Sequence, residues 1–210
     1  MQITSIIRRA AQVNPNGIAT IFEDRQQSWS QMLDRVARLA GALQNLGLRA
    51  GDRVALLSLN SDRYIEYYFA TVWAGGAMMP MNIRWAAAEC AYALNDAGVK
   101  ILVVDEAFKG VASEIHPQVE GLETLIYCGD AETPIGMLNY EEILTAANPA
   151  PDAGRGGDDL AGVFYTGGTT GFPKGVMLSH TNFYVGGVAN AHEINMRDGI
   201  VYLHAAPMFH

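Results

Sequence analysis

The sequence predicts an α/β fold, a layered α-β-α arrangement around a largely parallel sheet. Short apolar runs alternate with amphipathic segments of about ten to fifteen residues, which is typical of βαβ units. The run at 53–59 is apolar at almost every position, as expected of a strand that helices cover on both faces. Half of the 210 residues are apolar and only 17% are charged, which indicates a globular chain with a substantial core.

The first half of the chain contains three expected helices. Isoleucine and alanine recur at helical spacing over 3–13. Ser30 is placed to cap a second helix, whose apolar stripe runs to Gly47, and Asn60 and Ser61 are placed to cap a third at 62–74. We expect strands at 18–22 and 53–59, with a polar turn at 23–25. The aromatic residues of the third helix have the spacing of a buried face.

The second half continues the alternation. Gly98 is placed to end a helix at 86–97. The other expected elements are strands at 77–81, 100–104, 124–128, 160–164 and near 200–206, and helices near 106–116 and 181–195. Residues 147–159, rich in Pro, Gly, Ala and Asp, predict a surface linker. The adjacent carboxylates Glu141-Glu142 and Asp158-Asp159 are expected on the solvated surface.

Charge and cysteine content exclude several classes of function. The net charge is −8 and no basic stripe is present, so we expect no nucleic-acid partner. Cys90 and Cys128 lie in apolar segments without zinc-ligand spacing, which indicates buried free thiols in a reducing compartment. The histidines lack metal spacing, and no G-x-S-x-G elbow is present. Without a signal peptide or an apolar run of membrane-spanning length, we expect a cytoplasmic protein with no transmembrane segment.

The most informative run is 165–176, YTGGTTGFPKGV, which lies between two apolar stretches. Glycines let the backbone approach a ligand closely, and successive backbone N–H groups in such a loop form an anion-binding concavity. Threonine hydroxyls and a lysine add further donors. A Walker A loop is excluded, because Pro173 precedes Lys174 and Gly175 follows it. Since a short apolar run follows Lys174, the sequence predicts a strand–loop–strand phosphate cradle; the alternative is a glycine-rich turn without a ligand.

The stretch 165–180, YTGGTTGFPKGVMLSH, resembles the signature of the AMP-forming adenylate synthetases. The resemblance extends over the chain through Asn60-Ser61, the segments AGGA at 74–77 and LNDAG at 94–98, and Pro-Met-Phe-His at 207–210. Gly167 is a departure, because the family usually has serine there; that variant occurs among fatty-acyl ligases. The Pro-Met-Phe-His ending favours acyl- or aryl-CoA ligases over the adenylation domains of peptide synthetases.

The resemblance implies a two-step reaction, in which ATP activates a carboxylic acid to an acyl-adenylate and coenzyme A then takes the acyl group as a thioester. It implies ATP, Mg²⁺ and coenzyme A as cofactors or cosubstrates, with fatty acids as the favoured substrates. The residues implied around the β- and γ-phosphates are Thr166, Gly167, Gly168, Thr169, Thr170 and Gly171. Lys174 either joins them or is a solvated loop lysine, and His210 either borders the carboxylate pocket or packs structurally.

The resemblance also implies that residues 1–210 are the N-terminal portion of the AMP-binding domain, without the small C-terminal domain. The family's magnesium ligand, ribose-binding aspartate and catalytic lysine are expected beyond residue 210, so we assign neither catalytic nor metal-binding residues to the chain. We therefore expect the chain to be an incomplete fragment that is inactive alone. A non-catalytic nucleotide-binding or interaction fragment and an aryl-CoA ligase remain alternatives. The sequence leaves the oligomeric state open.

Overall fold

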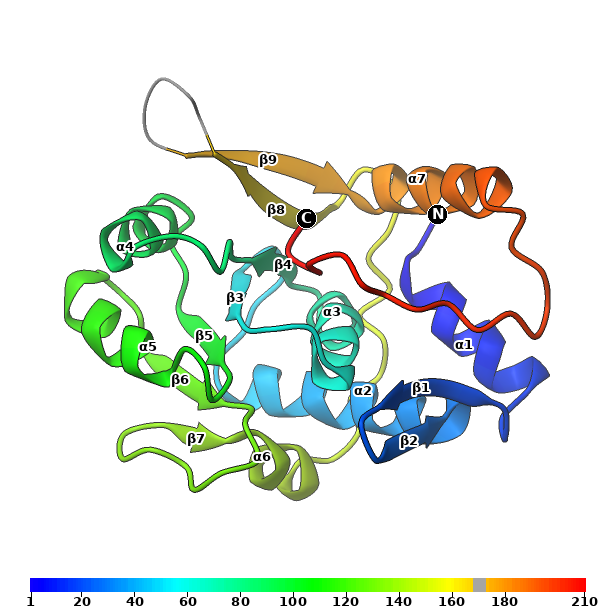
Figure 1. Ribbon diagram of the computed structural model, residues 1–210, viewed down its shortest axis with the longest axis horizontal. Helices are drawn as coiled ribbons and strands as arrows, with labels where there is room; N and C mark the ends of the chain where they lie inside the picture. Colours follow the sequence, from blue (N-terminus) through cyan, green and yellow to red (C-terminus); the bar gives the residue numbers. More distant parts are fainter. Residues whose placement is uncertain (168–172) are drawn as a thin grey trace.

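The computed structural model describes residues 1–167 and 173–210, and within them a seven-stranded sheet forms the centre (Figure 1). Its spatial order is β7-β6-β5-β3-β4-β8-β9, and every neighbouring pair is parallel except β8 and β9. The strands are β3 (Arg53–Leu57), β4 (Ala77–Pro80), β5 (Ile101–Val104), β6 (Thr124–Tyr127), β7 (Leu138–Asn139), β8 (Leu160–Thr166) and β9 (Lys174–Ser179). A separate antiparallel hairpin joins β1 (Ile18–Phe22) to β2 (Arg25–Ser28).

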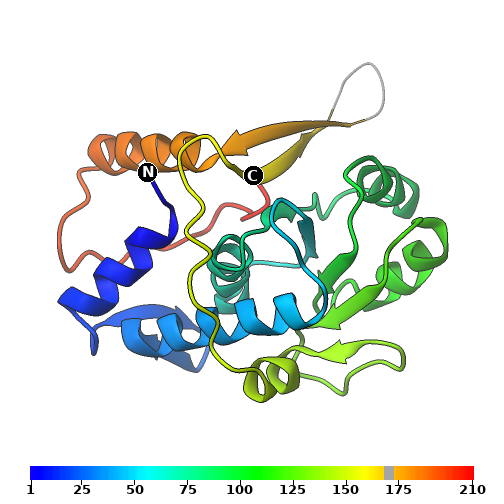
Figure 2. The ribbon, with the colours of Figure 1, turned by 180° about the vertical axis from the view of Figure 1, so that it is seen from behind.

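Helices cover both faces of the sheet, which confirms the predicted α-β-α layering (Figures 1 and 2). They are α1 (Thr4–Val13), α2 (Trp29–Asn45), α3 (Asp62–Trp73), α4 (Ala87–Asp96), α5 (Lys109–Ile115), α6 (Tyr140–Ala146) and α7 (His180–Glu193), with a 3₁₀ turn at His116–Gln118. Side chains of α1, α2, α3 and α6 pack on the face that carries Val54 and Leu56. Side chains of α4 and α5 pack on the opposite face, with Ala55 and Leu57. The alternation along β3 explains why its sequence is apolar throughout.

The expected cap of α2 was wrong by two residues. The N-cap is Ser28, whose Oγ accepts from the backbone N–H of Gln31 (3.2 Å) while the Gln31 side chain accepts from the Ser28 N–H (2.8 Å). This reciprocal capping box satisfies two backbone donors at once. Ser30 has no Glu or Gln three residues later with which to form such a box. The polar turn expected at 23–25 is confirmed at residues 23 and 24, and Arg25 begins β2.

Two further expectations near the ends of elements differ from the structure. The strand expected near 200–206 is irregular chain, with Val201 and Leu203 more than four-fifths exposed, so its apolar run lacks the burial that stabilises a strand. Helix α6 was missed, although Asn139 caps it by accepting from the N–H of Glu142 (3.0 Å). The pattern Asn-x-x-Glu was the signal for that helix start.

The segment 147–159 lies against α2 and α3, and Figure 2 shows it running across them on the near side of that view. The N–H of Ala150 donates to the Ala37 carbonyl, and its own carbonyl accepts from the Trp73 indole N–H, both at 2.9 Å. A Cβ at Gly41 would lie 2.2 Å from the Asn148 carbonyl oxygen, so glycine is required for this close approach. These contacts tie the segment to the body of the fold.

Helix α3 is bound to the sheet through its aromatic side chains, whose burial the sequence predicted. Tyr64, Tyr67 and Trp73 are buried, and Tyr68 is partly so. The Tyr67 hydroxyl donates to the Val54 carbonyl (2.6 Å) and accepts from the Met79 N–H (2.7 Å). One side chain therefore satisfies backbone groups on two neighbouring strands, β3 and β4.

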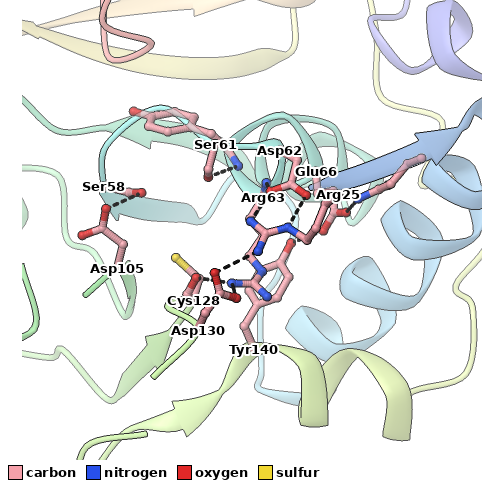
Figure 3. Close-up of polar contacts among 12 residues, drawn as sticks. Arg25, Ser58, Ser61, Asp62, Arg63, Glu66, Asp105, Cys128, Asp130 and Tyr140 are labelled. Carbon is pink, nitrogen blue, oxygen red and sulfur yellow. Dashed lines mark hydrogen bonds and ion pairs between the residues drawn. The ribbon is translucent and has the colours of Figure 1, made fainter. Parts of the chain in front are cut away.

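The other side of α3 carries a network of arginines and carboxylates (Figure 3). Glu66 is buried and accepts from Arg35 Nε (2.6 Å), Arg35 Nη2 (3.0 Å), Gln27 Nε2 (2.7 Å) and the Tyr140 hydroxyl (2.8 Å). Arg35 also pairs with Glu141, which in turn accepts from Arg63 Nε (3.0 Å). Glu141 was expected to be a solvated carboxylate, and this pairing corrects that expectation.

The same network reaches the β1–β2 hairpin and the loop after β6. Arg25 pairs with the buried Asp62 (2.9 Å) and with Asp130 (2.8 Å), and hydrogen bonding to Arg25 holds the pKa of Asp130 below its usual range. The Arg63 guanidinium donates to the Cys128 carbonyl (2.7 Å). An open pocket of about 570 Å³ lies beside these residues. Because its three guanidiniums are already paired with carboxylates, we interpret the pocket as part of the scaffold.

Both cysteines are buried free thiols, as the sequence predicted. Burial raises the pKa of Cys90 and of Cys128 to about 12. Since the thiolate is the reactive form of cysteine, both side chains are chemically quiet at neutral pH.

We predict that Glu66→Gln lowers the free energy of unfolding by about 2–4 kcal/mol, because it removes the buried charge that pairs with the half-buried Arg35. Urea denaturation measures the change. The matched control is Asp34→Asn on α2, which breaks only the exposed pair with Arg38 and should cost about 0.5 kcal/mol or less. Equal losses for the two variants would contradict the assignment of Glu66 as the centre of the network.

Candidate functional site

The glycine-rich run joins the two strands of the β8–β9 hairpin, which confirms the predicted strand–loop–strand setting. Thr166 pairs with Lys174 in the antiparallel ladder, and both residues are exposed at the end of the hairpin that projects from the body of the molecule (Figure 1). Gly167 follows directly. The hairpin therefore brings Thr166, Gly167 and Lys174 together. The other residues expected around phosphate, Gly168, Thr169, Thr170 and Gly171, lie outside the described residues.

Contacts from α4 and its preceding loop hold the ladder of this hairpin close to its loop end. The Tyr165 hydroxyl donates to Asp96 at 2.5 Å, and its ring meets Trp85 edge-on at 6.2 Å between centroids. Burial and the neighbouring Asp96 carboxylate raise the pKa of Tyr165 above its ordinary value, so it remains a neutral donor at physiological pH. The orientation of the hairpin is thus fixed by Asp96 and Trp85, which are not part of the β8–β9 ladder.

Close packing within the hairpin depends on two glycines. A Cβ at Gly162 would lie 2.9 Å from the Phe164 ring and 3.2 Å from the backbone oxygen of Met78 on β4. A Cβ at Gly175 would lie 2.8 Å from Val163. Gly167 is different, because a Cβ there would meet no described heavy atom within 4 Å. The described residues would therefore leave room at position 167 for the serine that the family usually has there.

The hairpin leaves the carboxyl edge of the parallel strands, where ligands bind in open α/β sheets. Along the same edge, Asp105 follows β5 and accepts from the Ser58 hydroxyl (3.1 Å) and the Leu59 N–H (2.8 Å) after β3 (Figure 3). This carboxylate joins two neighbouring strand ends. It also gives a fixed position to Asn60, the next residue along the chain.

His210 lies on a separate segment, which returns to this edge from α7. Residues 200–206 are mostly exposed, but Met208 and Phe209 are buried at 6% exposure each. The ring of His210 lies 4.5 Å from that of Phe209, and its backbone N–H donates to the Pro207 carbonyl (3.3 Å). The side chain of His210 is exposed, so it is accessible to a ligand at the surface.

His180, the last residue of the glycine-rich signature, is the first residue of α7 and is buried. Its Nδ1 accepts from the backbone N–H of Ile3 at 3.3 Å, which ties the N-terminal segment to the end of β9. Burial lowers the pKa of His180 below its ordinary value. The hydrogen bond joins this strand-to-helix turn to a residue 177 positions earlier in the chain.

Comparison with known proteins places this architecture in a family. Residues 7–210 match the AMP-binding enzyme family. The chain belongs to that family. It is 34% identical over 193 residues to a long-chain-fatty-acid–CoA ligase of Thermus thermophilus, covering 90% of this chain and 35% of the relative. It is 33% identical over 202 residues to a feruloyl-CoA synthase of an Amycolatopsis species, covering 96% of this chain and 38% of the relative.

Solved structures agree with the family assignment. The O-succinylbenzoate coenzyme A synthetase of Bacillus subtilis, in complex with AMP, superposes with a TM-score of 0.81 at 26% identity. The match covers 97% of this chain and 49% of that structure. The chain thus spans less than half the length of the curated relatives cited above.

Neither a membrane-spanning helix nor a cluster of metal-ligating side chains is found within the described part of the chain. None of the helices in residues 1–167 and 173–210 combines the length and apolar character needed to cross a bilayer. Within the same residues, no three His, Cys, Asp or Glu side chains converge to hold a metal ion.

We predict that Gly162→Ala lowers the free energy of unfolding by about 1–3 kcal/mol, because the added methyl group forces β8 away from Met78 on β4. The control is Gly186→Ala in the middle of α7, where an added Cβ meets open space. That variant should be neutral or more stable, since alanine is the better helix former. Thermal unfolding compares the two, and a reversed order would contradict the close packing of β8.

A second prediction concerns pH. The folded state favours the neutral His180 ring, whereas the unfolded chain takes up the proton near the ordinary pKa of 6.5. The contribution of His180 to stability is therefore complete above pH 6.5 and is lost as the pH falls through 6.5 towards the lower folded pKa. His180→Asn keeps an acceptor but does not titrate, so its unfolding free energy should fall less steeply over this range. Urea denaturation at a series of pH values measures both slopes, and identical slopes would refute the prediction.

Proposed function

We propose that the protein containing this chain is an AMP-forming acid–thiol ligase. A carboxylate oxygen of the substrate acid attacks the α-phosphorus of ATP, the bond to the bridging oxygen breaks, and pyrophosphate leaves with the electron pair. The thiol of coenzyme A then attacks the acyl carbon, AMP leaves, and the thiol proton passes to solvent. The observation that carries the proposal is the glycine- and threonine-rich run on a strand–loop–strand hairpin at the carboxyl edge of the sheet.

The loop's role in this reaction is to stabilise the leaving pyrophosphate. We assign this contact to Thr166, Gly167, Gly168, Thr169, Thr170, Gly171 and Lys174. The exposed Thr166 hydroxyl and Lys174 ammonium lie at paired positions, so they can donate to phosphate oxygens from both sides of the loop. Mg²⁺ would accompany the triphosphate, neutralising phosphate charge while keeping several water ligands. We assign no magnesium ligand to the described residues.

The acid substrate is assigned to the surface near His210, whose exposed imidazole can donate to a carboxylate oxygen. We propose a fatty acid, since Gly167 replaces the usual serine without a packing requirement and a relative is named for long-chain fatty acids. An aromatic acid is the second candidate, because another relative is named for feruloyl-CoA. The proposed compartment is the cytoplasm, because the two buried thiols suit a reducing environment.

Acid-dependent exchange of pyrophosphate into ATP tests the proposal. The complete open reading frame that contains this chain is assayed with fatty and aromatic acids of increasing size. We expect exchange that requires the acid, and CoA-dependent thioester formation with the same acid. No exchange with any acid, in a protein shown to be folded, would refute the ligase proposal.

We predict that Lys174→Ala in the complete protein lowers kcat/KM for ATP in the exchange assay about tenfold, because it removes a charged donor to the leaving phosphates. The KM for the acid should change little. The control is Lys109→Ala, which removes a surface lysine at the start of α5 that is paired with Glu106. If both variants retain full activity, Lys174 is a solvated loop residue.

A further inference from the structure

The last residues of the chain are held by two side chains, that of Asn60, which precedes α3, and that of Tyr68 in the middle of the helix. The Asn60 carboxamide donates to the carbonyls of His204 (3.3 Å) and Ala206 (2.8 Å), and its oxygen accepts from the Met208 N–H (2.8 Å). The Tyr68 hydroxyl donates to the Met208 carbonyl. Both backbone polar groups of Met208 are thus held by side chains about 140 residues earlier in the chain.

This anchor falls where an exposed segment becomes buried. Val201 and Leu203 are almost fully exposed, whereas Met208 and Phe209 are 6% exposed. Residues 200–210 form neither helix nor strand, so no backbone ladder holds them in place. Asn60 and Tyr68 thus supply the side-chain hydrogen bonds that hold the backbone two residues before His210.

Asn60 itself is held rigidly. The preceding residues Ser58 and Leu59 donate to Asp105, and the following Ser61 caps α3 by accepting from the Tyr64 N–H (3.2 Å). Tyr68 lies on the same helix, two turns along, with its ring 5.1 Å from that of Tyr64. A rigid support of this kind is what a binding residue on an irregular segment needs in order to keep its geometry.

We infer that Asn60 and Tyr68 are positioning residues for the acid substrate, acting through His210. The inference rests on the proposed function, which assigns the substrate carboxylate to His210. Asn60 supplies both a donor and an acceptor to one backbone segment, a combination that neither aspartate nor alanine can reproduce. The site that binds the acid is thereby connected to the carboxyl end of β3 and to α3.

The test compares Asn60→Ala, Asn60→Asp and Tyr68→Phe with wild type in the complete protein. We expect Asn60→Ala to raise the KM for the acid about tenfold in the exchange assay while the KM for ATP stays within about twofold. Asn60→Asp keeps the acceptor for Met208 but turns a carboxylate oxygen toward two carbonyls, so it should behave like alanine. Tyr68→Phe should act in the same direction with a smaller effect.

The matched control is Asn95→Ala. Asn95 also bridges two backbone groups, donating to the Gln118 carbonyl (3.0 Å) and accepting from the Glu120 N–H (2.8 Å), but it does so from the last turn of α4. It should leave both KM values unchanged. A general loss of packing would raise the KM for acid and ATP together, and that result would overturn the positioning role.

Two further measurements make the inference independent of total activity. In a His210→Ala background, adding Asn60→Ala should have little further effect on the KM for the acid, because both changes act on one interaction. Additive effects would overturn the route through His210.

Hydrogen–deuterium exchange measures the anchor directly. Exchange in the peptide 204–210 should be faster in Asn60→Ala than in wild type, and it should not change in Asn95→Ala. Unchanged hydrogen–deuterium exchange in Asn60→Ala would overturn the anchor. If wild type shows no exchange activity with any acid, the proposed function fails, and the hydrogen-exchange result alone decides the anchor.

Discussion

The carboxylate of Glu66 is the constraint on which the arrangement of the first half of the chain depends. It is almost fully buried, and a buried charge is tolerated only when hydrogen bonds replace its hydration. Its donors come from Gln27 on β2, Arg35 on α2 and Tyr140 on α6. Two regions that are distant in sequence, the consecutive β2 and α2 and the much later α6, must therefore meet at α3 before this charge is satisfied. Few other packings of the same elements would meet that requirement.

Because Glu66 fixes α3, it also fixes what the rest of the helix contacts. Tyr67, the next residue, joins β3 to β4 through one hydroxyl group. Tyr68 and the preceding Asn60 hold the segment that ends at His210. One helix thus connects a buried ionic network, the centre of the sheet and the proposed acid site. A substitution in the Glu66 network can therefore alter the geometry of the proposed acid site through α3, although no residue of the network contacts the substrate.

Much of the fold follows from the sequence, because apolar periodicity and helix caps are local signals. They indicated the layers, most strands and the strand–loop–strand setting of the glycine-rich run. Ser28 was missed as a cap because Ser30 offered the same residue type, and only the reciprocal bonds with Gln31 distinguish them. The expected strand near 200–206 failed because β propensity does not supply a pairing partner. The roles of Asn60, Glu66 and Glu141 depend on residues far away in sequence, which no local pattern records.

The antiparallel β8–β9 hairpin has a consequence for the order of folding. Its strands are close neighbours in sequence, so their ladder can form quickly, whereas Met78 and Gly162 must close a long stretch of chain before β4 pairs with β8. Contact order therefore favours a pathway in which the hairpin forms as a local unit and the parallel sheet later sets its orientation. The loop that we assign to phosphate would acquire its supporting ladder early and its place relative to the acid site late. The phosphate loop and the acid site would then come together only when the parallel sheet is complete.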